Sequence, residues 1–201
     1  AHSLSTVAGG GFSTHDESIG FFDSGLIEAV CIIFMLLSAA SFAVHYAAIF
    51  SGKPLRYFYD SEFRFFLTVV MSIILITLIF HTISNSYADI LLTLRASIFH
   101  TVSIVTTSGF TTENFSLWPS FLPYLLLVGA FMGACSQSVG GGIKTWRVLI
   151  MLNQAYKEIL SIIHPNAVLS TKIGNKVIDS NIAEKVWGFF SIYVFIFMFL
   201  L

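Results

Sequence analysis

Residues 100–112 read HTVSIVTTSGFTT, and residues 2–14 read HSLSTVAGGGFST. When the chain is shifted by 98 residues, six of the thirteen positions are identical, among them Gly11/Gly109 and Phe12/Phe110. Each copy precedes a long apolar stretch, so the sequence indicates an internal repeat with a short loop between helices. Duplicated loops of this kind predict pseudo-repeats arranged around a common axis.

The composition places these repeats in a membrane. Of the 201 residues, 56% are hydrophobic and 10% are charged, whereas soluble domains carry about 25% charged residues. The sequence therefore predicts an all-α integral membrane protein. The net charge of −1 gives no reason to expect a nucleic-acid partner. The chain begins without Met and inside one copy of the repeat, from which we expect it to be a piece of a longer polypeptide.

Hydropathy and charge suggest a topology. Apolar runs near the spanning length of about 20 residues occur at 26–50, 65–83 and 118–135, and another starts at 186. We expect the run 26–50 to be one continuous helix, whereas the less apolar stretch 88–109 should enter the membrane and return. Nine of the ten Lys and Arg residues lie in 53–64 and 144–185, which the positive-inside rule assigns to the cytoplasm.

The repeated loops are rich in Gly, Ser and Thr. Extended backbone at membrane depth is tolerated where it is buried in protein or lines a wet cavity, and its carbonyl groups can replace the water shell of a cation. Neither loop carries an acidic side chain, which favours carbonyl oxygens over carboxylates as ligands. The structural alternative is a Gly/Ser turn that lets two helices pack closely. We expect the K⁺ ligands to be the backbone carbonyls of Ala8, Gly9, Gly10, Gly11, Thr106, Thr107, Ser108 and Gly109.

A second unusual stretch, GACSQSVGGG, occupies residues 133–142. Each glycine costs about 1 kcal/mol of helix propensity relative to Ala, so we expect the helix to break there. A small-residue face for helix packing is the alternative. Lys144 and Arg147 follow on one helical face, either as a cationic pair near a pore or as side chains that reach the cytoplasmic interface.

Other polar residues have simpler interpretations. We expect Arg95 to be an interfacial anchor, and His2 and His100 to be packed, hydrogen-bonded histidines. Asp16 and Glu113 follow the two loops on the outer side, where they would either enrich cations at the mouth or form ordinary solvated surface.

The repeat strings, together with GACSQSVGGGIKTWR and HPNAV (residues 164–168), resemble the TrkH potassium-uptake proteins of the Trk/Ktr/HKT superfamily. That family builds one pore from four helix–pore loop–helix repeats. The resemblance implies that this chain holds two of the four pore loops, around a central ion pathway, and cannot form a pore alone. It also implies that the broken helix is a gate beneath the filter, formed by Ser138, Gly140, Gly141, Gly142, Lys144 and Arg147.

The resemblance further implies uptake of K⁺ as the transported ion, without enzymatic chemistry. It also implies a homodimer in the lipid of the bacterial inner membrane and a cytosolic nucleotide-binding subunit, TrkA, with residues 164–185 as the partner-facing surface. The expected division is 1–62 for the end of one repeat, 63–163 for a complete repeat, and 164–201 for a linker and the next helix. An intramembrane hydrolase or a membrane scaffold subunit is the alternative, and isotope uptake by the intact protein separates the three.

Overall fold

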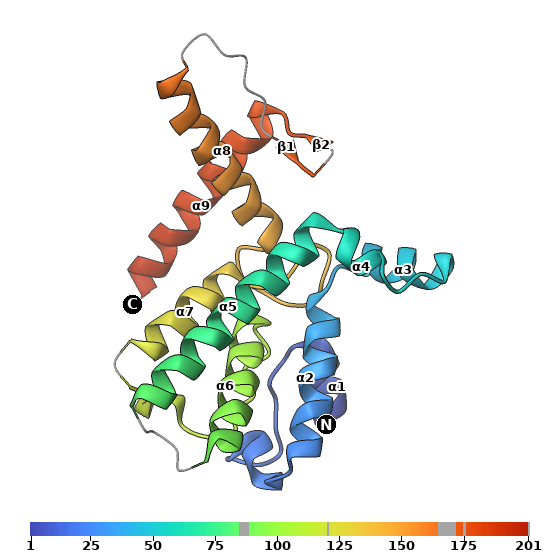
Figure 1. Cartoon of the computed structure of the whole chain (residues 1–201), viewed down its shortest axis with the longest axis vertical. Helices are drawn as coiled ribbons and strands as arrows, with labels where there is room; N and C mark the ends of the chain where they lie inside the picture. The colour runs from blue at the N-terminus through green and yellow to red at the C-terminus, as the bar shows by residue number, and fades with distance from the viewer. Residues whose placement is uncertain (85–88, 120, 165–171, 175, 201) are drawn as a thin grey trace. The chain divides into compact units, whose positions relative to one another are not determined.

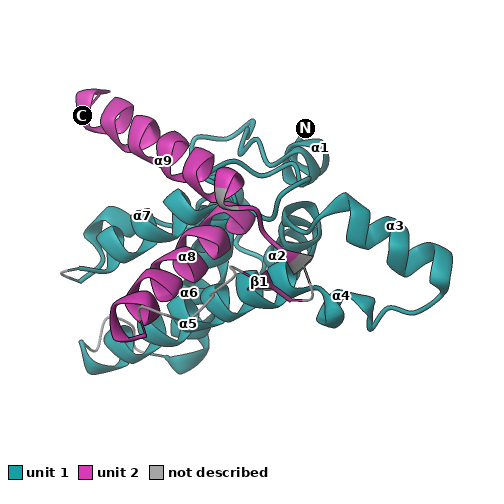
Figure 2. Cartoon of the chain, turned by 90° about the horizontal axis from the view of Figure 1, so that it is seen from above, with its two compact units in different colours: residues 1–144 teal, residues 145–201 magenta. Residues whose placement is uncertain are grey.

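A computed structural model describes residues 1–84, 89–119, 121–164, 172–174 and 176–200 (Figure 1). The chain divides into two compact units, residues 1–144 and 145–201, which Figure 2 colours separately. The expected boundaries at 62 and 163 concern the repeats rather than these units, and they stay a prediction. Part of the HPNAV motif and of segment 164–185 lies outside the described residues.

The first unit is a helical bundle built around α6 (Ile90–Val105), which packs against α2 (Gly25–Ala39), α5 (Ser61–Ile83) and α7 (Leu122–Met132) (Figure 1). Large side chains from all four helices fill the centre, and Met35, Phe66, Phe99 and Leu126 are buried there. The short helix α1 (His2–Ala8) packs on α2. The unit also contains the 3₁₀ turns η1 (Ser18–Phe22) and η2 (Phe115–Leu117).

Local sequence explains where several helices begin and end. Asp60 and Asp89 cap α5 and α6 by accepting the backbone N–H groups of Phe63 and Leu91. Helix α7 ends after eleven residues at its C-cap Gly133, which takes a φ of 68°. The expected break in the glycine-rich stretch is therefore confirmed. The expected apolar run 118–135 is correspondingly a short helix rather than a full span.

The run 26–50 is not one continuous helix. It bends by 99° between α2 and α3 (Phe42–Ser51), and Figure 1 shows α3 leaving the end of α2 sideways. The short helix α4 (Arg56–Tyr59) then leads into α5. Nothing in the local sequence breaks the helix, since Ser38, Ala39, Ala40 and Ser41 include no Gly or Pro. The backbone groups at the corner are bonded to a distant loop, and such tertiary bonds override local propensity.

The second unit contains α8 (Thr145–Ile163) and α9 (Ser180–Leu200), which pack together. Between them is a two-residue antiparallel hairpin, β1 (Lys172–Ile173) with β2 (Lys176–Val177), that the sequence did not predict. Across the described residues, α5 and residues 181–200 are each long and apolar enough to cross a membrane, and the bent pair α2–α3 would make a third span.

Candidate functional site: two repeat loops and a glycine-rich loop

The two repeat loops, residues 8–14 and 106–112, share one backbone conformation. Gly9 and Thr107 hold equivalent positions, with φ of 62° and 60°, and Gly11 and Gly109 have φ of 65° and 83°. A positive φ is readily adopted by glycine, whereas for a β-branched residue such as Thr107 it is strained. The repeat seen in the sequence is therefore also a repeat of backbone geometry.

The same turn hydrogen bonds close both helices. The N–H of Gly10 donates to Ser5 O at 3.0 Å, and that of Ser108 donates to Ser103 O at 2.9 Å. One residue earlier, Gly9 and Thr107 donate to the carbonyls of Thr6 and Ile104. Helices α1 and α6 thus end in the same way, and each is followed directly by its repeat loop.

The two loops also meet. A Cβ placed on Gly11 would overlap the carbonyl oxygen of Ser108 and lie 3.2 Å from the carbonyl carbon of Gly109. Only a residue without a side chain fits this contact. Thr106 and Ser108 are buried, and Ser103 supports the second loop by donating its hydroxyl to Phe110 O at 2.7 Å. The two loops predicted to bind K⁺ are therefore in contact where Gly11 meets Ser108 and Gly109.

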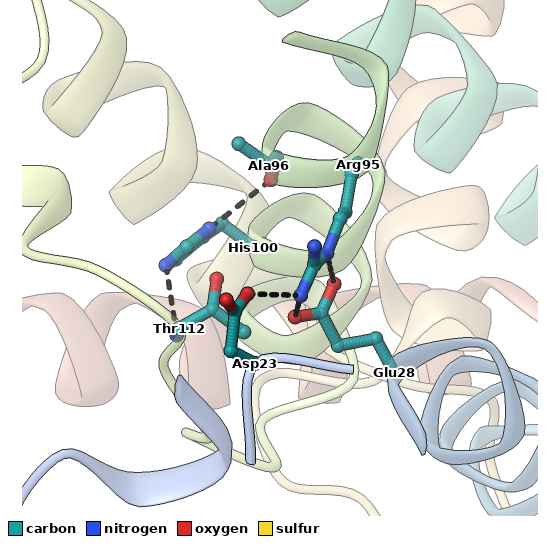
Figure 3. Close-up of polar contacts among 6 residues, drawn as sticks. All are labelled: Asp23, Glu28, Arg95, Ala96, His100 and Thr112. Carbon is teal, nitrogen blue, oxygen red and sulfur yellow. Dashed lines mark hydrogen bonds and ion pairs between the residues drawn. The ribbon is translucent and has the colours of Figure 1, made fainter. Parts of the chain in front are cut away.

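The repeated histidines fasten each helix to the far end of its own loop. His100 is fully buried, with Nδ1 3.1 Å from Ala96 O, and the Thr112 N–H donates to Nε2 at 3.4 Å (Figure 3). In the first copy, His2 Nε2 lies 2.8 Å from Ser13 Oγ. The expectation of a packed, hydrogen-bonded core histidine is confirmed for His100, whereas His2 is hydrogen-bonded but only partly buried.

Arg95 is held more specifically than an interfacial anchor would be. Its guanidinium reaches both carboxylate oxygens of Glu28, at 2.7 and 2.8 Å, and Asp23 at 3.1 Å (Figure 3). The Glu28 side chain is only 3% exposed, whereas that of Asp23 is 91% exposed. This bidentate pair ties α6 to α2, and so joins the helix before the second loop to the helix after the first.

The glycine-rich loop, residues 133–144, folds back on itself. Its two ends lie close together at Gly133 and Gly142, where a Cβ on either glycine would overlap backbone atoms at the other end of the loop. Lys144 Nζ donates to the carbonyls of Ser138 and Gly140 rather than extending away from the loop. The ammonium group therefore stabilises the folded loop from within.

This loop lies against the second repeat loop. The N–H of Gly141 donates to Thr107 Oγ1 at 2.5 Å, and a Cβ on Gly140 would come within 2.8 Å of Thr106 O. The residues predicted for the gate between 138 and 144 thus belong to one loop, which contacts Thr106 and Thr107. Arg147 belongs to the second unit, where its guanidinium lies 4.4 Å from the centre of the Phe189 ring.

A cavity of about 380 Å³ lies beside the other end of the second loop, lined by Thr111 and Thr112 and by the acidic residues Asp16, Glu17 and Glu113. Glu113 also accepts a hydrogen bond from Trp118 Nε1 at 2.8 Å. Asp16 and Glu113 therefore line one cavity beside the second loop.

Comparison with known proteins agrees with this geometry. The family described as "TrkH: Cation transport protein" matches residues 1–201. The chain belongs to the TrkH family. It is 47% identical over 200 residues to "Trk system potassium uptake protein TrkH" of Halomonas elongata and 44% identical over 198 residues to the protein of that name in Escherichia coli K12. These alignments cover 100% and 98% of the chain but 41% of each relative, so the chain spans about two fifths of their length.

A solved TrkH structure shows the same fold. The crystal structure of the potassium transporter TrkH from Vibrio parahaemolyticus superposes with a TM-score of 0.94 and 42% sequence identity. The match covers 98% of this chain and 42% of that one. The predicted fold class is confirmed, and this TrkH-family chain is part of a multi-pass protein of the bacterial inner membrane.

Sequence reasoning missed two contacts at the glycine-rich loop of this TrkH-family chain. Glu62 accepts hydrogen bonds from Ser136, and the α2–α3 corner is bonded to the loop backbone. Glu62 stands in the first turn of a helix, where an acidic residue is ordinary, so the sequence carries no signal of a partner 74 residues away.

Proposed function

We propose that the protein containing this chain takes up K⁺, and that its two repeat loops supply half of a carbonyl-lined selectivity filter. The observation that carries the proposal is the contact between two loops of equal backbone geometry at Gly11 and Ser108. A filter needs several carbonyl groups fixed at one distance from an ion, and repeated turns of like geometry would favour that arrangement without acidic side chains. The relatives' printed names, which describe potassium uptake, support the choice of ion.

The helices that precede the loops add to the attraction for a cation. The C-terminal end of a helix carries roughly −0.5 of an elementary charge, and α1 and α6 both end at their loops. The acidic cavity lined by Asp16, Glu17 and Glu113 would raise the local cation concentration beside the second loop. Both effects favour cation entry without fixing which monovalent ion passes.

The proposal gives the glycine-rich loop the role of a gate. Its bond to Thr107, one of the residues proposed for the filter, supports this role, as do its several poor helix formers, which would give it alternative packings of similar energy. Lys144 and Arg147 would add an electrostatic barrier to cations. The proposal also includes a homodimer and a cytosolic TrkA subunit, as the resemblance implies, with segment 164–185 facing that partner.

Competition for flux through the full-length protein tests this function. K⁺, Rb⁺, Na⁺ and Cs⁺ would compete for influx into cells that lack other uptake systems. The native protein should prefer K⁺, and Gly109→Ser should admit Na⁺ more readily, because φ at Gly109 is 83° and a side chain would shift the carbonyls.

Gly52→Ser is the matched control. Gly52 has a φ of 60°, ends α3, and like Gly109 has no atom within 4 Å of an added Cβ. Unchanged K⁺/Na⁺ preference in a well-inserted Gly109→Ser protein would reject the filter assignment. An equal loss of K⁺/Na⁺ preference in both variants would show that backbone strain alone causes the effect.

A further inference from the structure

The glycine-rich loop is held on one side by the corner between α2 and α3. The carbonyls of Ser38 and Ala39, which the helix break leaves without helical partners, accept the N–H groups of Val139 and Cys135 at 3.3 and 3.0 Å. In return, the N–H of Phe42 donates to Gln137 O at 3.0 Å. These three bonds explain the 99° bend and fasten the loop by its backbone.

On another side the loop is held by a carboxylate. Glu62, in the first turn of α5, is 6% exposed and accepts two hydrogen bonds from Ser136, one from the backbone N–H and one from the hydroxyl at 2.7 Å. Hydrogen bonds to a carboxylate are stronger than those between neutral groups. Ser136 lies five residues before Gly141, which contacts Thr107.

The two anchors belong to one stretch of chain. Helices α3 and α4 connect the corner at residues 38–42 to Glu62. Both ends of this connecting segment therefore form hydrogen bonds to the glycine-rich loop. The corner bonds use backbone atoms, which every residue type supplies. The second anchor depends on one side chain, and a substitution there removes the anchor without altering the loop's own sequence.

We propose that Glu62 is a positioning residue that holds the glycine-rich loop against the second repeat loop and so keeps the pathway closed. The inference rests on the proposed function, because it assigns a holder to the proposed gate. Glu62 acts through Ser136 and does not touch the ion. Loss of its carboxylate frees the Ser136 end of the loop, and the loop spends more time away from Thr107.

The test uses Glu62→Gln in the full-length protein. Glutamine keeps the size of the side chain but replaces one acceptor oxygen with an NH₂ group that cannot accept. Asp60→Asn is the matched control, because Asp60 lies two residues away and caps α5 through Phe63 N. An effect that comes only from removing a negative charge at the start of α5 would appear in both variants.

The loop carries its own probe, Cys135, which is buried with 0% exposure. In a Cys31→Ala background, a small thiol reagent is applied to membranes, and modification of the peptide that contains Cys135 is followed by mass spectrometry. We expect modification about tenfold faster in Glu62→Gln, together with higher K⁺ influx and unchanged K⁺/Na⁺ preference, since weakening a bond to a charged group shifts the closed state by about that factor. Asp60→Asn should leave the rate near that of the parent.

Ser136→Ala supplies a second variant that removes one of the two bonds. It should accelerate modification by less than Glu62→Gln, and the double variant should not exceed Glu62→Gln by the product of the two effects. Equal modification rates in the parent and Glu62→Gln, or equal acceleration in Asp60→Asn, would overturn the proposal. Cys135 reactivity does not depend on ion preference, so failure of the filter assignment in flux competition is a separate outcome.

Discussion

Gly9 and Gly11 allow the contact between the two repeat loops to be tested at constant backbone strain. Their φ values, 62° and 65°, are nearly equal, but a Cβ on Gly9 would meet nothing within 4 Å. A Cβ on Gly11 would overlap the Ser108 carbonyl oxygen. Gly11→Ala and Gly9→Ala therefore differ in the steric contact and not in the dihedral penalty.

The magnitudes follow from this difference. A left-handed conformation costs an L-residue about 1–2 kcal/mol, and this cost applies to both variants. Overpacking adds about 1–3 kcal/mol, and here it falls on Gly11→Ala alone because backbone must move to relieve it. Since 1.4 kcal/mol is a factor of ten, this added strain should make K⁺ binding about 5- to 150-fold weaker in Gly11→Ala than in Gly9→Ala if it falls on the filter.

The assay is K⁺ influx by the full-length protein at increasing K⁺, with and without competing Na⁺, normalised to the protein in the membrane. We expect Gly9→Ala to show the smaller change in half-saturation and ion preference, because it carries the dihedral cost without the steric contact. Gly11→Ala should show a higher half-saturation for K⁺ and weaker rejection of Na⁺. If both inserted variants keep the same preference for K⁺, the contact at Gly11 is not part of a filter and the reasoning fails.

Two further predictions concern the gate and the ion pair. Deletion of residues 138–142 should raise K⁺ influx with near-native ion preference and reduce dependence on a cytosolic partner, because it removes the contact with Thr107; a well-inserted deletion variant with native influx would refute the gate. Glu28→Gln should lower stability by about 1–3 kcal/mol, measured as the thermal unfolding midpoint in detergent, because it breaks a charge-assisted bond to Arg95. Asp23→Asn, at a 91% exposed carboxylate, should change stability by about 0–1 kcal/mol, and equal effects would contradict the importance of burial.

The local features of this chain could be predicted from its sequence. The repeat and the helix break at Gly133 depend on glycines and small polar residues that act within a few positions. The same pattern identified the loop residues that the structure brings together at Gly11 and Ser108. Where a residue type restricts its own backbone conformation, the sequence alone predicts the local structure.

Long-range pairing explains what the sequence did not reveal. The stretch 38–41 has ordinary helix formers, and it breaks because loop residues about a hundred positions later bond to its carbonyls. Arg95 lies 67 residues from Glu28, and Glu62 lies 74 residues from Ser136. Each of these polar groups also has an ordinary interpretation at a helix end or an interface, so a single sequence gives no signal that selects the partner.

The one strained residue in the repeat loops marks the difference between the two copies. Thr107 takes a φ of 60°, which is costly for a β-branched side chain, at the position where the first copy has Gly9. Its hydroxyl accepts the N–H of Gly141 and so forms the contact with the glycine-rich loop, which Gly9 has no side chain to make. Strain of this kind persists where the surrounding structure holds it in place, and it often accompanies function. The repeats thus share their backbone turns, and the exchange of Gly for Thr gives the second copy the hydroxyl that binds the glycine-rich loop, which we propose to be the gate.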